Sequence, residues 1–315
     1  MSKICVIGGS GFIGRHIVGM LAAQGHVVVV PTRGRDRAKH LITLPTVDVI
    51  EANVHDAATL PDLLAGCDAL INLVGILHSR PGMPYGRDFA RAHVELPTAL
   101  AAACMSAGVP RLVHMSALCA AADAPSEYLR SKADGEAAVL AVADKVAVTI
   151  FQPSVVFGQG DRFLNLFATL LRISPFMPLG SPNARFQPVY VGDVARAFVQ
   201  SLTERASHGK TYALAGPRVY TLRELIAYTG RVIGCERPII GLGKILSGLQ
   251  AFSLEILPGS LLTLDNLRSM ERDNVSDAAF PFGIVPEALE AVAPSYLSGV
   301  LPRTRFNLFR IRAGR

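Results

Sequence analysis

A run of glycines follows a short apolar strand at the very start of this 315-residue chain. The apolar segment 3–7 is followed by Gly8, Gly11 and Gly14 in the spacing G-x-x-G-x-x-G, and helical periodicity continues over 13–24. Glycines in such a strand-to-helix turn let the backbone approach a pyrophosphate, whose negative charge then faces the N–H groups and dipole of the helix N-terminus. The order of elements therefore favours a dinucleotide site over a mere tight turn. The residues of the turn expected to contact the nucleotide are Gly8, Ser10, Gly11, Phe12, Ile13 and Gly14.

Composition excludes several classes of protein. Half of the residues are hydrophobic and 18% are charged, which is typical of a folded globular protein. We expect no membrane span, because no charge-free and proline-free apolar stretch reaches 18 residues, and no signal peptide, because the N-terminal apolar run is the first strand and the glycine turn follows at once. The five cysteines have no C-x-x-C or metal-ligand spacing, which predicts a reduced cytoplasmic protein without a metal site. The net charge of +6 suits anionic ligands but is too mild and dispersed to indicate nucleic acid.

Strands alternate with helices through the first half of the chain. This predicts an α/β fold with a doubly wound parallel sheet of the Rossmann type, covered by helices on both faces. We expect 1–157 to form the dinucleotide-binding domain, to which 187–215 returns, and 158–315 to form a smaller, mainly helical C-terminal lobe. A capping box starting at Thr221 predicts a helix N-terminus there. The predicted strands are 26–30, 47–52, 69–74, 111–115, 146–151 and 210–215, and the predicted helices are 60–65, 89–107 (kinked at Pro97), 127–143 and 193–203.

A second motif carries a resemblance to a known family. Tyr128 and Lys132 form the pattern Y-x-x-x-K, and with the glycine motif the chain resembles the short-chain dehydrogenase/reductase superfamily. Three further segments, 152–158, 188–195 and 220–225, are similar to its extended or atypical branch. The runs 185–194 and 216–221 resemble, within that branch, the complex I accessory-subunit family and its bacterial relatives. The resemblance covers nearly the whole chain except about the last dozen residues.

The chemistry of the Tyr/Lys pair follows from its spacing. Residues four apart share one face of a helix, so Tyr128 and Lys132 project side by side. A neighbouring ammonium favours the phenolate, and Tyr128 could exchange a proton with a carbonyl or hydroxyl group while a hydride moves to or from a nicotinamide. The resemblance implies that Lys132 also binds the nicotinamide ribose. The alternative is an ordinary exposed pair on an alanine-rich helix.

A third catalytic residue is less clearly defined. Relatives place a Ser or Thr after the fifth strand, and Ser116 is the candidate. Only twelve positions separate it from Tyr128, so Ala117 is the alternative occupant of that position, with Ser116 a hydroxyl that satisfies the strand end. Gln152 stands where relatives carry Arg, and these departures support cofactor binding more than turnover.

The end of the second strand bears on the choice of cofactor. It carries no carboxylate to bind a ribose 2′-hydroxyl, and an arginine there pairs well with a 2′-phosphate. Arg33 is the first candidate and Arg35 the second, so NADP(H) is preferred and NAD(H) is the alternative. The resemblance implies further cofactor contacts from Asn53, Val54, Leu73, Val74, Gly75, Lys132, Pro153 and Ser154.

The C-terminal region is apolar and then basic. The stretch 239–264 has few charges, and the tail 303–315 has five arginines and no acidic residue. These segments suit a substrate pocket, a protein partner or an anionic membrane surface; the alternatives are a core helix and a solvated tail.

Three functions are compatible with these features. The first is an NAD(P)H-binding protein linked to respiratory complex I or ubiquinone metabolism, cytoplasmic or peripheral at the inner face of a membrane, through a quinone-linked membrane complex or the membrane surface itself. The second is a soluble NADP-dependent reductase, epimerase or dehydratase that uses Tyr128 and Lys132. The third is a binding module that senses NADP(H).

Overall fold

The computed structural model describes residues 1–243, 246–248 and 263–298. The chain divides into two compact units. The first comprises Met1–Ser154, Val191–Leu214 and Ser276–Val285, and the second comprises Val155–Tyr190, Ala215–Val275 and Pro286–Arg315. The sequence patterns did not predict that 276–285 belongs to the first unit.

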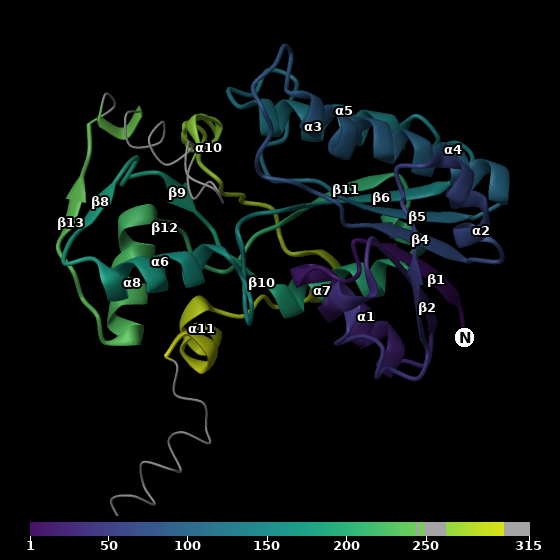
Figure 1. Cartoon of the computed structure of the whole chain (residues 1–315), viewed down its shortest axis with the longest axis horizontal. Helices are drawn as coiled ribbons and strands as arrows, with labels where there is room; N and C mark the ends of the chain where they lie inside the picture. Colours follow the sequence, from purple (N-terminus) through teal and green to yellow (C-terminus); the bar gives the residue numbers. More distant parts are fainter. Residues whose placement is uncertain (244–245, 249–262, 299–315) are drawn as a thin grey trace, which may run out of the picture. The chain divides into compact units, whose positions relative to one another are not determined.

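A seven-stranded parallel sheet forms the centre of the first unit (Figure 1). Its strands run in the order β11-β6-β5-β4-β1-β2-β3, so the direction of winding reverses beside β1. In doubly wound sheets of this kind, ligands bind beyond the carboxyl ends of the strands where the order reverses. The predicted fold class is confirmed. The strands are β1 (Lys3–Ile7), β2 (Val27–Thr32), β3 (Val47–Glu51), β4 (Ala69–Asn72), β5 (Arg111–Met115), β6 (Ala147–Pro153) and β11 (Lys210–Leu214).

The five inner strands form because short apolar runs are buried on both faces of the sheet, whereas the edge strands β3 and β11 keep exposed residues. Their predicted bounds agree with the structure to within a few residues. The prediction for β4 extended to Val74, but the strand ends at Asn72. The Asn72 side-chain oxygen accepts a hydrogen bond from the Val74 N–H at 3.1 Å, which replaces the next ladder bond.

Helices cover both faces of the sheet. Helices α2 (Leu60–Leu64), α4 (Leu96–Ala107) and α5 (Glu127–Leu140) lie on one face, and α1 (Phe12–Ala23) and α7 (Val191–Ser201) lie on the other (Figure 1). The core of the first face joins Leu64, Leu100 and Val139 to Leu112 and Ile150 of the sheet. On the second face, the rings of Phe151 and Phe198 pack 4.6 Å apart. Burial of these apolar faces holds the helices against the sheet, and this fixes where the ends of the strands lie.

The helix predicted over 89–107 is divided in the structure. A short helix, α3 (Arg87–Phe89), leads into a π-helical segment, η3 (Ala90–Glu95), and then into α4. Pro97 lies in the first turn of α4, where its missing N–H disrupts the α-helical pattern of the preceding turn. The predicted irregularity at Pro97 is therefore present, and it takes the form of a π-helical turn.

The second unit is mainly helical. Its helices are α6 (Phe163–Ile173), α8 (Leu222–Ile233), α10 (Leu264–Ser269) and α11 (Leu289–Leu297). Its short strands pair as β7 (Val156–Phe157) with β10 (Val189–Tyr190), β9 (Arg185–Phe186) with β12 (Tyr220–Thr221), and β8 (Met177–Leu179) with β13 (Ile239–Gly241). A single apolar core unites α6, α8 and α11.

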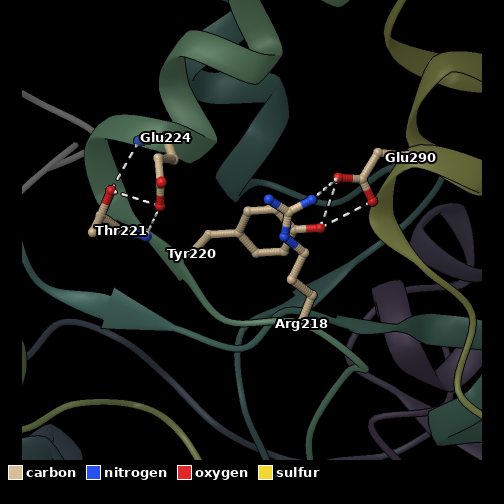
Figure 2. Close-up of polar contacts among 5 residues, drawn as sticks. All are labelled: Arg218, Tyr220, Thr221, Glu224 and Glu290. Carbon is tan, nitrogen blue, oxygen red and sulfur yellow. Dashed lines mark hydrogen bonds and ion pairs between the residues drawn. The ribbon is translucent and has the colours of Figure 1, made fainter.

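Two groups of polar contacts order the start of α8 and connect the preceding segment with α11 (Figure 2). The Thr221 hydroxyl accepts a hydrogen bond from the Glu224 N–H, and the Glu224 carboxylate accepts one from the Thr221 N–H, so the predicted capping box is confirmed. The Tyr220 hydroxyl donates to the Glu290 carboxylate at 2.9 Å, and Arg218 pairs with the same carboxylate at 3.5 Å. These contacts hold α11 against β12.

The features predicted for the C-terminal region fall largely outside the described residues. This applies to 244–245 and 249–262 of the apolar stretch and to the whole basic tail 303–315. Within the described ranges, none of the helices combines the length and apolar character needed to cross a bilayer. The same part of the chain holds no cluster of His, Cys, Asp and Glu side chains suited to a metal ion.

Candidate dinucleotide site

The backbone of the glycine turn is packed too closely to admit side chains. A Cβ on Gly14 would lie 2.3 Å from the Gly8 carbonyl oxygen, and one on Gly11 would lie 3.2 Å from the same atom. Gly8 itself has a φ of +82°, a conformation that glycine adopts without strain. In the part of the chain that the structure describes, no side chain caps the start of α1 and its first turn holds no acidic residue. The turn therefore fits an anionic pyrophosphate.

The segment after β4 lies directly against this turn. A Cβ on Gly8 would contact the Leu73 carbonyl carbon at 3.3 Å, and the Leu73 N–H donates to the Ile7 carbonyl at 2.9 Å. Asn72 donates to Nδ1 of the buried His114 on β5 at 3.1 Å, which fixes the orientation of its amide. The structure therefore brings together the glycine turn and the predicted residues Leu73, Val74 and Gly75.

Cationic side chains gather after β2 and β3. Arg33 is exposed immediately after β2, and the charges of Arg33 and Arg91 both lower the pKa of the half-buried His55, after burial itself. Arg35 is exposed at the start of the following 3-10 turn. Sequence reasoning missed Arg91 and His55, because they come from η3 and from the loop after β3. Their grouping depends on the fold.

Arg15 adds a further positive charge next to the glycine turn. Its guanidinium lies 5.7 Å from the centre of the Phe12 ring, and its charge lowers the pKa of His40, although burial lowers that pKa more. No sequence pattern singled out Arg15, although it immediately follows the third glycine of the motif.

Asn53 and Val54 occupy a turn after β3. The Asn53 side-chain oxygen accepts a hydrogen bond from the His55 N–H at 3.2 Å, and the Asn53 carbonyl accepts one from Thr59 at 3.0 Å. Val54 is partly buried against the core below α2 and α4. Asn53 therefore orders the loop on which His55 stands, and its predicted contact with adenine stays a prediction.

Tyr128 and Lys132 lie on one face of α5 but do not have the electrostatic relationship expected from the sequence. Lys132 is buried and its ammonium donates to the Met115 carbonyl of β5 at 2.7 Å. Burial lowers the pKa of Lys132 to about 8, opposed by the charge of Glu136. Burial also raises the pKa of Tyr128 to about 12. The expectation that the ammonium favours a phenolate is therefore corrected, because desolvation of Tyr128 dominates.

The surroundings of Ser116 and Ala117 differ. Ser116 is buried, and among the described residues its hydroxyl makes no hydrogen bond, whereas the Gln152 side chain donates to the Glu136 carboxylate at 2.7 Å. Burial raises the pKa of Glu136, and the nearby Ser116 and Gln152 side chains lower it. Ala117 belongs to an apolar cluster with Ala124 and Leu129, against which Tyr128 packs.

His93 is a further residue that links the elements of the site. Its Nε2 accepts the Ile76 N–H at 3.0 Å, and its Nδ1 lies 2.8 Å from the Ser131 hydroxyl. Burial lowers its pKa to about 2, with smaller effects of Lys132 and His114, so the ring is neutral. A Cβ on Gly135 would lie 2.0 Å from the His93 carbonyl oxygen, so the backbones of η3 and α5 meet.

Pro153 and Ser154 complete the predicted set at the end of β6. The Pro153 carbonyl accepts the Leu118 N–H at 3.0 Å, and the Ser154 N–H donates to the Leu214 carbonyl at 2.9 Å. All predicted site residues therefore lie in the first unit. Ser10, Phe12 and Ile13 are partly exposed in the turn and first helical turn, where their backbone N–H groups can meet a phosphate.

Comparison with protein families shows which family the chain resembles. Residues 4–215 match the sequence model of the NAD dependent epimerase/dehydratase family. A protein of Arabidopsis thaliana named NADH dehydrogenase (ubiquinone) 1 alpha subcomplex subunit 9, mitochondrial, is 32% identical over 93% of this chain and 76% of its own length. The Mus musculus protein of the same name is 34% identical over 71% of this chain, but only 59% of its own length is covered.

Solved structures agree on the fold alone. A dTDP-glucose 4,6-dehydratase from Streptomyces venezuelae, solved with NAD and TYD bound, has a TM-score of 0.67 at 23% identity and covers 77% of this chain and 85% of its own. The Bordetella bronchiseptica enzyme WbmH in complex with NAD+ has a TM-score of 0.67 at 20% identity, over 97% of this chain and 99% of its own.

Proposed function

This chain belongs to the NAD dependent epimerase/dehydratase family, the extended branch of the short-chain dehydrogenases/reductases, and we propose that it holds NADP(H) as part of a respiratory, quinone-linked assembly. The nicotinamide, when bound, supplies a carbon that can accept or donate a hydride. The residues of this chain would bind the cofactor through Gly11, Gly14 and Lys132.

The observation that carries the choice of NADP(H) is the cationic group after β2 and β3. After burial, the charges of Arg91 and Arg33 lower the pKa of His55, and the charge of Glu95 raises it, so two guanidinium groups and one carboxylate lie around this imidazole. A ribose 2′-phosphate brings two negative charges to this end of a cofactor, and guanidinium groups pair with phosphate through charge-assisted hydrogen bonds. No carboxylate stands at the end of β2 in the described chain to favour a 2′-hydroxyl instead.

The proposed assembly rests on the names of the relatives. The Arabidopsis thaliana and Mus musculus proteins are named as subunits of a ubiquinone-linked NADH dehydrogenase. We extend this association to the chain, with attachment at the inner face of a membrane through its C-terminal region. The environment of the Tyr/Lys pair agrees with a cofactor that is retained more than turned over, because Ala117, not a hydroxyl, lies in the apolar cluster beside Tyr128.

A second candidate is an NADP-dependent reductase, epimerase or dehydratase that uses Tyr128 and Lys132. A Caulobacter vibrioides protein named ceramide reductase favours it, with 32% identity over 62% of this chain and 59% of its own length. In that case Tyr128 would donate a proton to the carbonyl oxygen of the substrate while the nicotinamide transfers a hydride to the carbonyl carbon.

One purification separates the two candidates. The nucleotide that copurifies with the native protein is identified by mass and spectrum, and its release is followed in excess NADH. We expect NADPH that exchanges slowly, together with protein in the membrane fraction that is lost when 303–315 are removed. If the protein is absent from the membrane fraction and rapidly reduces several carbonyl compounds with NADPH, the second candidate replaces the first.

A further inference from the structure

His93 lies in the middle of a chain of hydrogen bonds that joins two elements of the first unit. Only 1% of its surface is exposed, and it stands on the π-helical segment η3, a rare geometry that is frequent at functional sites. Its Nε2 lies 3.0 Å from the backbone nitrogen of Ile76, in the loop after β4, and its Nδ1 lies 2.8 Å from the Ser131 hydroxyl of α5. The imidazole therefore bridges this loop and this helix.

The directions of these hydrogen bonds define where the ring carries its proton. A backbone N–H can only donate, so Nε2 accepts from Ile76 and bears no proton. Burial lowers the pKa of His93 to about 2, with smaller effects of neighbouring charges, so the ring is neutral and its proton is on Nδ1. The Nδ1–H group then donates to the Ser131 hydroxyl, which donates its own proton to the Tyr128 carbonyl at 2.7 Å. Each donor in this chain has an acceptor.

The loop at one end of the chain is the segment 73–76, which was predicted to contact the nucleotide. It lies against the glycine turn, where a Cβ on Gly8 would come within 3.3 Å of its backbone. The Asn72 side chain accepts the Val74 N–H at 3.1 Å, and the imidazole accepts the N–H two residues later. The exposed Gly75 lies between these two anchored N–H groups. The contacts on either side of Gly75 thus set the orientation of its peptide groups.

The helix at the other end of the chain carries the Tyr/Lys pair. Ser131 immediately precedes Lys132 and bonds to the Tyr128 carbonyl. The Tyr128 ring also packs edge-on against the His93 ring, with their centres 5.5 Å apart, and the Phe89 ring stacks on the same imidazole at 5.4 Å. The imidazole therefore contacts the tyrosine directly and reaches the backbone beside the lysine through Ser131.

We propose that His93 is a positioning residue whose Nδ1–H tautomer sets the distance between the nucleotide-facing segment 73–76 and the helix that carries Tyr128 and Lys132. The proposal rests on the proposed function, because it assigns segment 73–76 to the bound dinucleotide. Loss of the Nε2 acceptor would leave the Ile76 N–H without its partner, and the segment could then move away from the cofactor. A histidine that only filled space would depend on its size and not on which ring nitrogen accepts.

Two amide side chains separate the roles of the two ring nitrogens. The side-chain oxygen of glutamine can reach the place of Nε2, whereas the side-chain amide of asparagine ends near the place of Nδ1. We therefore expect His93→Gln to keep NADPH affinity within about threefold and His93→Asn to weaken it about tenfold. Fluorescence titration of the full chain measures these affinities. The matched control is Thr98→Ala, which removes an exposed hydroxyl bonded to the Val94 carbonyl and should leave the affinity unchanged.

A measurement on the wild type keeps the test decisive if the variants do not fold. In the nitrogen NMR spectrum of the histidine side chains, recorded without nucleotide, His93 is assigned through its coupling across the hydrogen bond from the Ile76 N–H. We expect a neutral ring that is protonated on Nδ1 and does not titrate between about pH 5 and about pH 8.

A ring protonated on Nε2, or one that titrates in this range, would overturn the inference. Equal NADPH affinity of folded His93→Gln and His93→Asn would overturn it as well. Because the spectrum needs no nucleotide, the two kinds of failure are distinguishable. Absence of NADPH binding by a wild type with the expected spectrum would overturn the proposed function, while the bridge between the loop and α5 would stand.

Discussion

Gly14 stands so close to Gly8 that a Cβ on Gly14 would lie 2.3 Å from the Gly8 carbonyl oxygen. The position of a Cβ is fixed by the backbone, and its neighbour here is a backbone oxygen, so no rotation of a side chain relieves this contact. The first turn of α1 is therefore fixed against the glycine turn, and its N–H groups are held at the position where a pyrophosphate would bind.

We expect Gly14→Ala to lower the free energy of unfolding by roughly 1–3 kcal/mol and to weaken nucleotide binding, since the turn must move to admit the methyl group. Gly19→Ala is the matched control on the same helix, because a Cβ there meets nothing within 4 Å. It should be neutral or stabilising by up to about 1 kcal/mol. Urea unfolding with and without NADPH measures both effects. Equal stabilisation in the two variants would show that helix propensity, not the contact with Gly8, decides the result.

Replacement of Arg33 tests the assignment of the 2′-phosphate. Loss of a charge-assisted pair costs roughly 1.5–3 kcal/mol, so Arg33→Ala should weaken NADPH about tenfold or more while NADH is unaffected. Arg37→Ala removes an equally exposed charge from the same segment and should change neither affinity. Calorimetric titration of the wild type and both variants with NADPH and NADH gives the six dissociation constants. Equal affinity of the wild type for NADPH and NADH would contradict the assignment.

Tyr128→Phe separates binding from proton transfer. NADPH affinity should stay within about twofold, whereas any turnover of a carbonyl substrate should fall at least about a hundredfold, because the proton donor is gone. The high pKa of Tyr128, about 12, further predicts no change in rate from its ionisation below about pH 10. Tyr85→Phe, which loses only a contact with Asp134, is the control. Turnover that survives in Tyr128→Phe would exclude this residue as the acid.

The buried Lys132 should give the folded protein a defined pH dependence. Its pKa falls from 10.5 to about 8 on folding, so the unfolded chain binds more protons between these values and stability rises with pH there. Below about pH 8 the full penalty of the buried charge is present, on the order of 3 kcal/mol. The measurement is the difference in unfolding free energy between wild type and Lys132→Met from pH 7 to pH 10. A difference that stays constant over this range would contradict the low pKa.

The fold followed from local patterns, whereas much of the site did not. Apolar runs and the glycine turn predicted the strands of the sheet because each of these signals lies within one segment. The neighbourhood shared by Arg33, Arg91 and His55 arises only when η3 and two loops converge, so no local pattern could show it. Glu136 could have been found from its spacing to Lys132.

The side chain after β5 illustrates a different limit of sequence reasoning. Ser116 and Ala117 are adjacent in the chain, and their order alone does not say which of them faces Glu136 and which joins the cluster beside Tyr128. That choice depends on how the strand end twists as it leaves the sheet. A shift of the strand end by one residue would place a methyl group where the hydroxyl group now lies.

The approach of Gly135 to the His93 carbonyl has a consequence for how the protein can change. Because the two backbones touch, η3 and α5 can neither slide nor roll past one another without separating, and the residues they carry toward the cofactor shift only together. A substitution as small as Gly135→Ala would thus reach Ile76, Lys132 and Glu136 without touching any of them. The distance between η3 and α5 is therefore fixed by their backbones, and sequence changes that keep this distance are limited to side chains.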